Sequence, residues 1–125
     1  MNLIRKFVSG RNAKNMLTLD HYSEKVICEP HIVKMDIEEE EIRAINGMTR
    51  LLKNVHPTLL IEIHPQFIKE LYGNPKLVKT MIEKLRRFGY NIEINLSYDQ
   101  ESSMWQRIEQ VNFLNYMRNF FIFAY

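Results

Sequence analysis

The chain has 125 residues, of which 46% are apolar and 26% are charged, so we expect one folded domain rather than a disordered segment. Its 17 Lys and Arg residues against 15 Asp and Glu residues give a net charge of +2, which is too small to indicate a nucleic-acid partner. The single cysteine, Cys28, excludes an internal disulfide, and no apolar run is long enough for a signal peptide or a membrane span, so we expect a cytoplasmic domain.

The first half of the chain predicts strands around one long helix. Residues 1–31 give the weakest pattern, with a short strand at 3–8 followed by turn-forming residues. Residues 32–37 form a mostly apolar strand, and 38–54 form a helix whose apolar residues recur at helical spacing. The clearest strand is 58–64, because its nearly continuous apolar run suits a parallel strand that is covered on both faces.

The second half continues this alternation of strands and helices. In order, we expect a short helix at 66–72, a helix at 75–88, a strand at 90–96, a loop at 97–102, a helix at 104–117 and a final strand at 119–125. The basic residues Lys84, Arg86 and Arg87 are expected on the solvated face of their helix. The alternation predicts an α/β sheet with right-handed crossovers and helices on both faces.

Acidic and imidazole side chains follow two of the predicted strands. Asp36 and Glu38 come at the end of one strand, and Glu62 and His64 at the end of the next. In α/β sheets, ligands bind beyond the carboxyl ends of the strands. If the two strands are parallel neighbours, all four side chains lie at one edge of the sheet. A carboxylate there can orient an acceptor hydroxyl, act as a general base or hold a metal.

These residues can be interpreted either as parts of a ligand site or as purely structural groups. Asp36 can cap the following helix, with residues 38–41 as its solvated acidic first turn. Glu62 and His64 alternate along a strand and therefore share a face, so that with Asp36 they can form an oxygen-and-imidazole metal site. Alternatively, Glu62 pairs with a lysine or a backbone amide, and His64 only ends the strand before Pro65.

Several segments in register resemble one known family. Residues 34–41, Lys-Met-Asp-Ile-Glu-Glu-Glu-Glu, resemble the K-x-D-x-E-G-x-E motif of the FkbM family of S-adenosylmethionine-dependent methyltransferases. Four flanking features agree in order with that family: Thr18-Leu19-Asp20 with its T-L-D segment, Gly47 with its helix glycine, residues 57–64 with its next strand, and Gly89-Tyr90 with its G-Y. The resemblance covers about residues 16–96.

The sequence departs from this family at two places. Glu39 replaces the glycine of the motif, and its longer side chain can obstruct a backbone approach or a substrate path. The glycine-rich turn that binds the cofactor in the methyltransferase fold is also missing. Only 33 residues precede Lys34, which is about the length of a single βαβ unit. The four glycines are also far apart in the sequence. No cofactor-binding residue is therefore assigned.

The resemblance then implies a truncated Rossmann-like methyltransferase sheet, which is the second half of the seven-stranded fold with an antiparallel last strand. In that fold the first and fourth strands are neighbours, so residues 32–37 become an exposed edge strand that invites pairing. Segment 3–8 can fold back over it, the chain can form a homodimer there, or a separate protein can supply the first half. We favour the first two, because each needs only this chain. We treat 1–125 as a single domain, with 1–31 as a covering segment and 32–125 as the half-fold.

By this resemblance, the expected function is methyl transfer from S-adenosylmethionine to a small-molecule hydroxyl oxygen, with help from a partner or a second copy. The expected catalytic residues are Asp36, Glu38, Glu62 and His64. Two alternatives stay open: a non-catalytic, dimerising or partner-binding remnant of a methyltransferase, and a divalent-metal-binding hydrolase. Under the expected methyltransferase function, no residue is assigned as a metal ligand.

Overall fold

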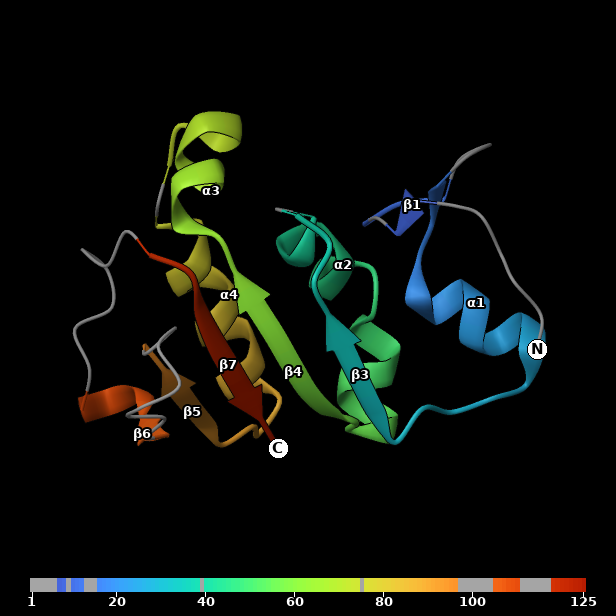
Figure 1. Ribbon diagram of the computed structural model, residues 1–125. Helices are drawn as coiled ribbons and strands as arrows, with labels where there is room; N and C mark the ends of the chain where they lie inside the picture. The colour runs from blue at the N-terminus through green and yellow to red at the C-terminus, as the bar shows by residue number, and fades with distance from the viewer. Residues whose placement is uncertain are drawn as a thin grey trace.

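The computed structural model in Figure 1 describes residues 7–8, 10–12, 16–38, 40–74, 76–96, 105–110 and 118–125. Its main sheet has five strands in the spatial order β3 (Ile32–Met35), β4 (Thr58–Ile63), β7 (Phe120–Ala124), β5 (Ile92–Asn95) and β6 (Gln106–Arg107). The helices are α1 (Leu19–Val26), α2 (Glu41–Asn46), the π-helix η1 (Leu51–Val55), α3 (Pro65–Tyr72), α4 (Leu77–Arg87) and the 3-10 helix η2 (Ile108–Gln110). The expected α/β class is confirmed at this level.

The strand directions agree with the sequence analysis. β3 and β4 are parallel neighbours, and β7 is antiparallel to both β4 and β5. The last strand is therefore antiparallel, as expected. Because β3 and β4 run in the same direction, their carboxyl ends lie at the same edge of the sheet.

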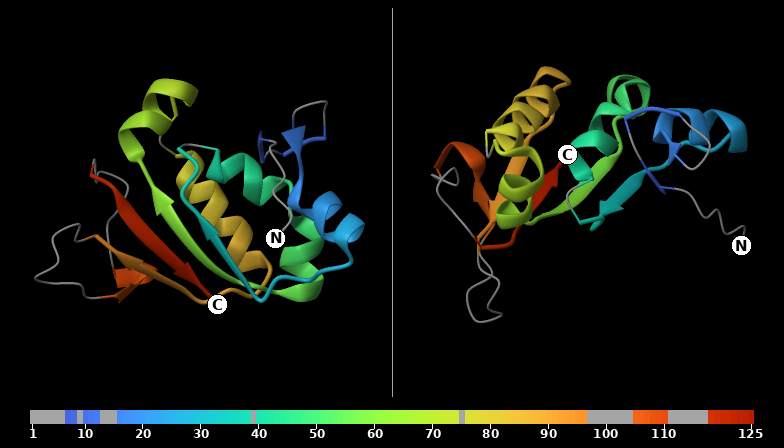
Figure 2. Two further views of the ribbon diagram at one scale, coloured as in Figure 1. Left: turned by 45° about the vertical axis from the view of Figure 1, so that its right-hand side comes forward. Right: turned by 90° about the horizontal axis from the view of Figure 1, so that it is seen from above.

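Among the residues that the structure describes, helices cover only one face of the sheet. Figure 2 (right) shows α1, α2 and α4 on the same side, and α2 contacts α4. Along β4, Leu59, Ile61 and Ile63 are fully buried, whereas Leu60 on the other face is only half-buried. The expectation of helices on both faces is wrong for the described residues. An apolar run identifies a buried strand, but it does not say which elements cover each face.

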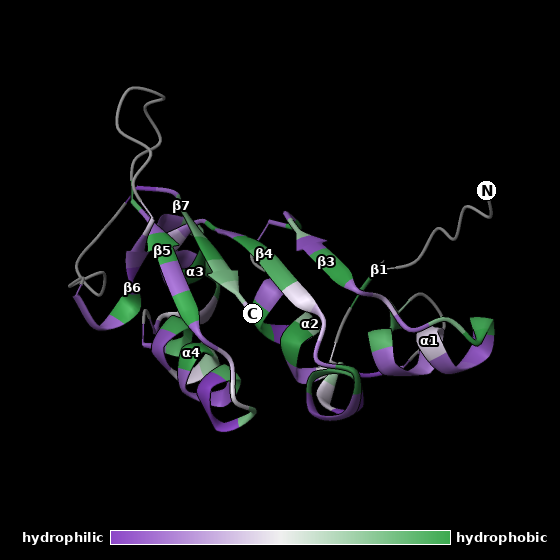
Figure 3. Cartoon of the chain, turned by 90° about the horizontal axis from the view of Figure 1, so that it is seen from below, coloured by the Kyte–Doolittle hydropathy of each residue, from purple (hydrophilic) through white to green (hydrophobic). Residues whose placement is uncertain are grey.

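Helix α4 shows how the covered face is formed. Val78, Met81, Ile82 and Leu85 recur at helical spacing and are buried. Figure 3 shows hydrophobic and hydrophilic residues along the same helix, as burial of a single side requires. The expected helix at 75–88 is confirmed over 77–87, and Pro75 lies outside the described residues.

The long helix expected at 38–54 is broken into pieces. Glu38 has a left-handed φ of 48°, so no helix begins there, and α2 starts only at Glu41. The π-helix η1 follows and ends at His56, which is also left-handed. The apolar stripe itself was predicted correctly, since its members are all at most 9% exposed: Ile42, Ile45, Met48, Leu51 and Leu52.

Lys84 holds α4 to the end of α2. Its Nζ donates to the Ile45 carbonyl oxygen, to Asn46 Oδ1 and to Thr49 Oγ1, at 3.1 to 3.2 Å. Burial lowers the pKa of the Lys84 amine, and the nearby charge of Asp20 partly opposes this shift. The prediction that Lys84 lies on a solvated face is therefore wrong.

The chain after β4 matches the sequence patterns only in part. The helix expected at 66–72 is present as α3 and ends before Gly73, whose φ is 62°. Pro65 lies just outside the expected range and is the first residue of this helix. The strands expected at 90–96 and 119–125 are present as β5 and β7. The helix expected at 104–117 is wrong over its described part, which contains β6 and η2. The loop expected at 97–102 lies outside the described residues.

The described part of residues 1–31 does not pair with β3. β1 (Phe7–Val8) and β2 (Met16–Leu17) form a separate parallel pair, and α1 lies beside β3 without adding a strand (Figures 1 and 2). Within the described residues, β3 has β4 as its only strand neighbour and is an edge strand. In the same part of the chain, no helix has the length and the apolar character that a membrane crossing requires.

Candidate functional site

Three of the four predicted site residues meet at the carboxyl edge of the sheet. Met35 pairs with Ile61 in the parallel ladder, so the register continued by one residue brings Asp36 beside Glu62. His64 follows two positions later, on the same face as Glu62. The potential ligand atoms of Asp36, Glu62 and His64 all lie within 4.8 Å of one another. We call these three residues the strand-end cluster.

The strand-end cluster has a buried part and an exposed part. The side chains of Glu62 and His64 are only 11% and 10% exposed, and Oε1 of Glu62 lies 3.4 Å from Nε2 of His64. Asp36 is exposed and accepts no hydrogen bond from a described residue. The other ring nitrogen of His64, Nδ1, is buried without a hydrogen-bond partner among the described residues. This part of the site therefore has unused hydrogen-bonding capacity.

His64 is held by the start of α3. Its carbonyl oxygen accepts the backbone N–H groups of Phe67 and Ile68, both at 3.2 Å. Pro65 suits the first helical position because it has no N–H to satisfy there. The imidazole also lies 6.1 Å from the Phe67 ring, centroid to centroid. A strand end that turns directly into a helix thus fixes the backbone of His64.

Asp36 is positioned by a residue that the sequence analysis did not single out. Oε1 of Glu41 accepts the backbone N–H of Ile37 at 2.8 Å, and Glu41 is fully buried. Its other carboxylate oxygen has no hydrogen-bond partner among the described residues. The capping interpretation is therefore reversed, since the helix carboxylate bonds to the chain beside Asp36. An acidic residue in the first helical turn, four positions after Ile37, was the available signal.

Glu38 does not join the cluster. It is exposed, and its left-handed backbone separates the strand end from the helix. Glu39, which stands where the family has glycine, lies outside the described residues. The expected edge thus gathers three of the four predicted residues and omits Glu38.

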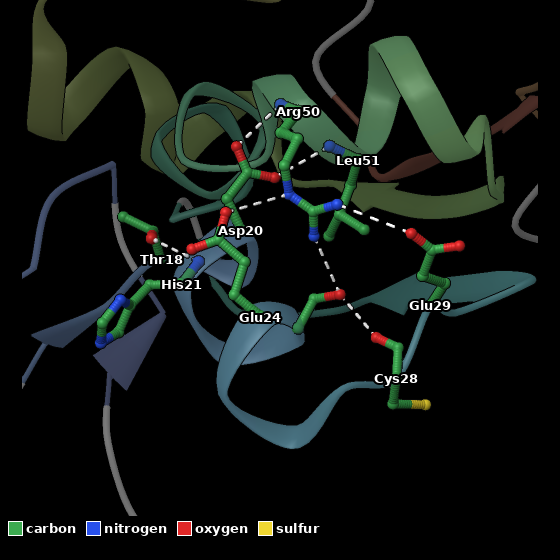
Figure 4. A network of polar contacts seen from close by, with 9 residues as sticks. Thr18, Asp20, His21, Glu24, Cys28, Glu29, Arg50 and Leu51 are labelled. Carbon is green, nitrogen blue, oxygen red and sulfur yellow. Dashed lines mark hydrogen bonds and ion pairs between the residues drawn. The ribbon is translucent and has the colours of Figure 1, made fainter.

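The T-L-D segment has a structural role (Figure 4). Thr18 accepts the N–H of His21 and so caps α1. The two oxygens of Asp20 accept the backbone N–H groups of Arg50 and Leu51, at 2.8 and 2.9 Å. This carboxylate therefore fastens α1 to the start of η1.

Arg50 extends the same contact. Its guanidinium lies 3.2 Å from the carboxylate of Glu24 and 3.7 Å from that of Glu29, and it donates to Ser23 Oγ. Ser23 in turn donates to the Cys28 carbonyl oxygen, which closes the loop after α1 (Figure 4). These polar groups hold the fold together.

The described residues do not fit S-adenosylmethionine by themselves. Gly10 lies against α2, where an added Cβ would be 3.1 Å from the Arg43 carbonyl oxygen. Gly47, Gly73 and Gly89 each follow the end of a helix. No two glycines share a turn, and the strand–helix unit that precedes β3, formed by β2 and α1, has Thr18 and no glycine at its turn. The glycine-rich cradle of the methyltransferase fold is thus not built by this part of the chain.

The fold and the site together define a class: a mixed α/β domain with an acid and imidazole site at the carboxyl ends of adjacent parallel strands. The family model described as the methyltransferase FkbM domain matches residues 4–92, well over half of the chain. The chain therefore belongs to the FkbM methyltransferase family. Neither the curated proteins nor the solved structures contain a match to it.

Proposed function

We propose that this chain forms the acceptor side of an O-methyltransferase, and that the strand-end cluster binds the hydroxyl group to be methylated. One observation carries the proposal: Asp36, Glu62 and His64 converge within 4.8 Å although they come from two strands. Ligand sites of open α/β sheets lie at this edge. Membership of a methyltransferase family supplies the reaction class.

The geometry suggests how these residues divide the work. Glu62 and His64 are nearly buried and face each other at 3.4 Å, so a proton lost by the acceptor hydroxyl can be taken up by this pair. Asp36 is exposed at the outer side of the cluster and orients the bound molecule.

We further propose that a second polypeptide supplies the cofactor contacts by pairing with β3. The free edge of β3 is flanked by apolar side chains that are unusually exposed, with Ile32 at 71% and Ile27 at 93%. Beside it lies a groove of about 550 Å³ between α1 and β3, whose lining includes Leu19, Val26 and Val33. Unpaired edges with apolar flanks favour addition of a strand.

The second polypeptide is proposed to carry the glycine-rich first half of a methyltransferase fold. A second copy of this chain would bring the same four isolated glycines and no phosphate- or cofactor-binding turn. Pairing with a different, glycine-rich segment would complete both the sheet and the site. The full seven-stranded sheet would therefore form only in the proposed complex.

Calorimetry with S-adenosylmethionine tests the proposed second polypeptide. For the purified chain alone we expect no binding heat up to about 1 mM, where binding would be worth about −4 kcal/mol. Co-expression with the amino-terminal half of an intact FkbM enzyme should give a complex that binds the cofactor at micromolar strength, about −8 kcal/mol. Ile32→Asp should prevent this complex, whereas the matched surface variant Leu71→Asp on α3 should not.

Three other outcomes would contradict these proposals. Micromolar binding by the chain alone would show that no second polypeptide is needed. A homodimer in sedimentation that Ile32→Asp dissociates would assign the β3 edge to a second copy. Methyl transfer by the complex that is unchanged in Glu62→Gln and His64→Gln would remove the strand-end cluster from the acceptor site and favour a non-catalytic role for this edge.

A further inference from the structure

The strand-end cluster brings together two carboxylates and one imidazole without a lysine or arginine to balance their charge. Among the described residues, Glu62 is paired only with His64, and no lysine or arginine forms an ion pair with Asp36 or Glu62. Carboxylates at low exposure are normally paired, or they coordinate a metal, because an uncompensated charge is costly to bury. The shortage of positive charge is thus located in the least exposed part of the site.

We propose that Asp36, Glu62 and His64 hold a divalent transition-metal cation, with Zn²⁺ as the preferred ion and Mn²⁺ as the next. Imidazole and carboxylate donors together suit these ions, whereas an all-oxygen set would suit Mg²⁺ or Ca²⁺. The cation completes the charge balance of the two carboxylates. This inference concerns the same residues as the acceptor site but does not depend on methyl transfer.

The distances fit a single cation after one small movement. Zinc ligands lie about 2.0 to 2.2 Å from the metal, so two ligands of a tetrahedral ion are roughly 3.4 Å apart. Glu62 Oε1 and His64 Nε2 already have this separation, at 3.4 Å. The span of 4.8 Å across all three residues exceeds the roughly 4 Å that two ligands on opposite sides of an ion can reach. Asp36 is exposed, so its side chain can rotate inward by the remaining distance.

A second observation points to a ligand independently of the carboxylates. His64 is 8% exposed, and its Nδ1 is buried with no hydrogen-bond partner among the described residues. Buried polar atoms without a partner are rare unless a ligand uses them. Because no described residue fixes the ring through Nδ1, the imidazole can coordinate a cation through Nε2 as placed, or through Nδ1 after the ring is turned over. In contrast, the ring of His56 stacks on Tyr90 and contacts the Phe88 carbonyl oxygen at 3.0 Å. Only His64 of these two is left with free capacity.

The remaining coordination position is open to a small molecule. Three protein ligands leave one position of a tetrahedral ion free, as in catalytic rather than structural zinc sites. A site of this kind binds water or an oxygen of an incoming molecule. The proposed cation therefore occupies a position where the acceptor hydroxyl would also arrive.

The test is metal binding to the chelator-treated chain, with neither S-adenosylmethionine nor an acceptor present. Titration with ZnCl₂ by calorimetry should give one saturable site of micromolar strength, and the same salt should raise the Tm in a thermal scan. Glu62→Gln, His64→Gln and Asp36→Asn should each weaken binding at least tenfold. Glu38→Gln and His31→Gln, which change exposed residues outside the cluster, are the matched controls and should leave the affinity unchanged.

Cobalt provides a readout of the coordination geometry. Co²⁺ in place of Zn²⁺ should give the intense visible absorption of a four-coordinate site, and His64→Gln should remove it. Far-ultraviolet circular dichroism identifies any variant that fails to fold, in which case Asp36→Asn, at an exposed position, still tests the site. Absence of saturable binding up to about 1 mM, or binding that is equal in the cluster variants and the controls, would overturn the proposal.

The outcome is separable from that of the proposed function. Metal binding that depends on the cluster, in a complex without methyl transfer, would contradict the acceptor site and support the cation. Methyl transfer that survives chelation, in a chain without saturable metal binding, would do the reverse.

Discussion

Two aspartates that carry the family resemblance have opposite surroundings. Both oxygens of Asp20 accept backbone N–H groups, from Arg50 and Leu51, and so join α1 to η1. Asp36 accepts no hydrogen bond from a described residue and is exposed at the end of β3. A carboxylate whose oxygens are taken by the backbone serves the fold, and one whose oxygens are unused is available to a ligand. The resemblance alone does not separate these roles.

Two histidines at opposite ends of β4 repeat this contrast. His56, just before the strand, is stacked on Tyr90 with the ring centroids 3.9 Å apart. His64, just after it, keeps a buried ring nitrogen without a described partner. The amino end of β4 is thus saturated by contacts within the fold, whereas the carboxyl end retains unpaired polar groups. Such local inconsistency is expected where a site, and not stability, determines the residues.

The largest effect on stability is expected from Asp20→Asn. The side-chain amide has one acceptor oxygen and one donor group, so one of the two backbone N–H groups of residues 50 and 51 loses its partner. The bond that remains also loses its charge. We expect the free energy of unfolding to fall by about 2 to 3 kcal/mol. Urea denaturation measures it, and a loss below about 0.5 kcal/mol would show that this contact does not fasten the fold.

A smaller loss of stability is expected from Glu41→Ala, which tests whether Glu41 positions the strand-end cluster. The variant leaves the Ile37 N–H without its acceptor and empties a fully buried position. The expected cost is about 1 to 2 kcal/mol. Glu40→Ala is the matched control, because its ion pair with Arg43 is largely exposed and contributes at most about 0.5 kcal/mol. Equal losses in the two variants would argue against a positioning role for Glu41.

Tyr90→Phe tests the contacts at the amino end of β4, and we expect the free energy of unfolding to fall by about 1 kcal/mol. The hydroxyl donates to the Pro57 carbonyl oxygen at 2.9 Å, and the variant leaves that oxygen unpaired. Burial also raises the pKa of Tyr90 to about 12. Between about pH 10 and 12 the unfolded state loses this proton while the folded state keeps it, so wild-type stability falls as the pH rises. Denaturation at pH 9 and pH 11 should therefore show a smaller fall in the variant.

The smallest effect on stability is expected from Asp36→Asn in the absence of a divalent cation. An exposed carboxylate without a described hydrogen bond contributes little, so the change should stay within about 0.5 kcal/mol. The comparison with Asp20→Asn is direct, since the same substitution is made at two motif positions. A loss similar to that of Asp20→Asn would show that Asp36 serves the fold after all.

The sequence predicted the elements that depend on local chemistry. The end of α3 before Gly73 was predicted because a left-handed glycine after the last turn acts within a few residues, whereas Pro65 as its first residue was not predicted. The apolar spacing identified the buried side of 38–54, although the helix itself is interrupted at Glu38 and after α2. At 104–117 the same spacing was misleading, since the described residues form β6 and η2.

For the site, the sequence determined that Glu62 and His64 share a face, because side chains alternate along a strand wherever the strand lies. Only the tertiary structure brought Asp36 to them, through the parallel pairing of β3 with β4, and left Glu38 aside. It also decided that Asp20 is fastened by N–H groups thirty positions away, and that helices cover one face of the sheet. Periodicity and capping are local and can be seen in the sequence. Saturation of a polar group depends on residues that only folding brings within hydrogen-bonding distance.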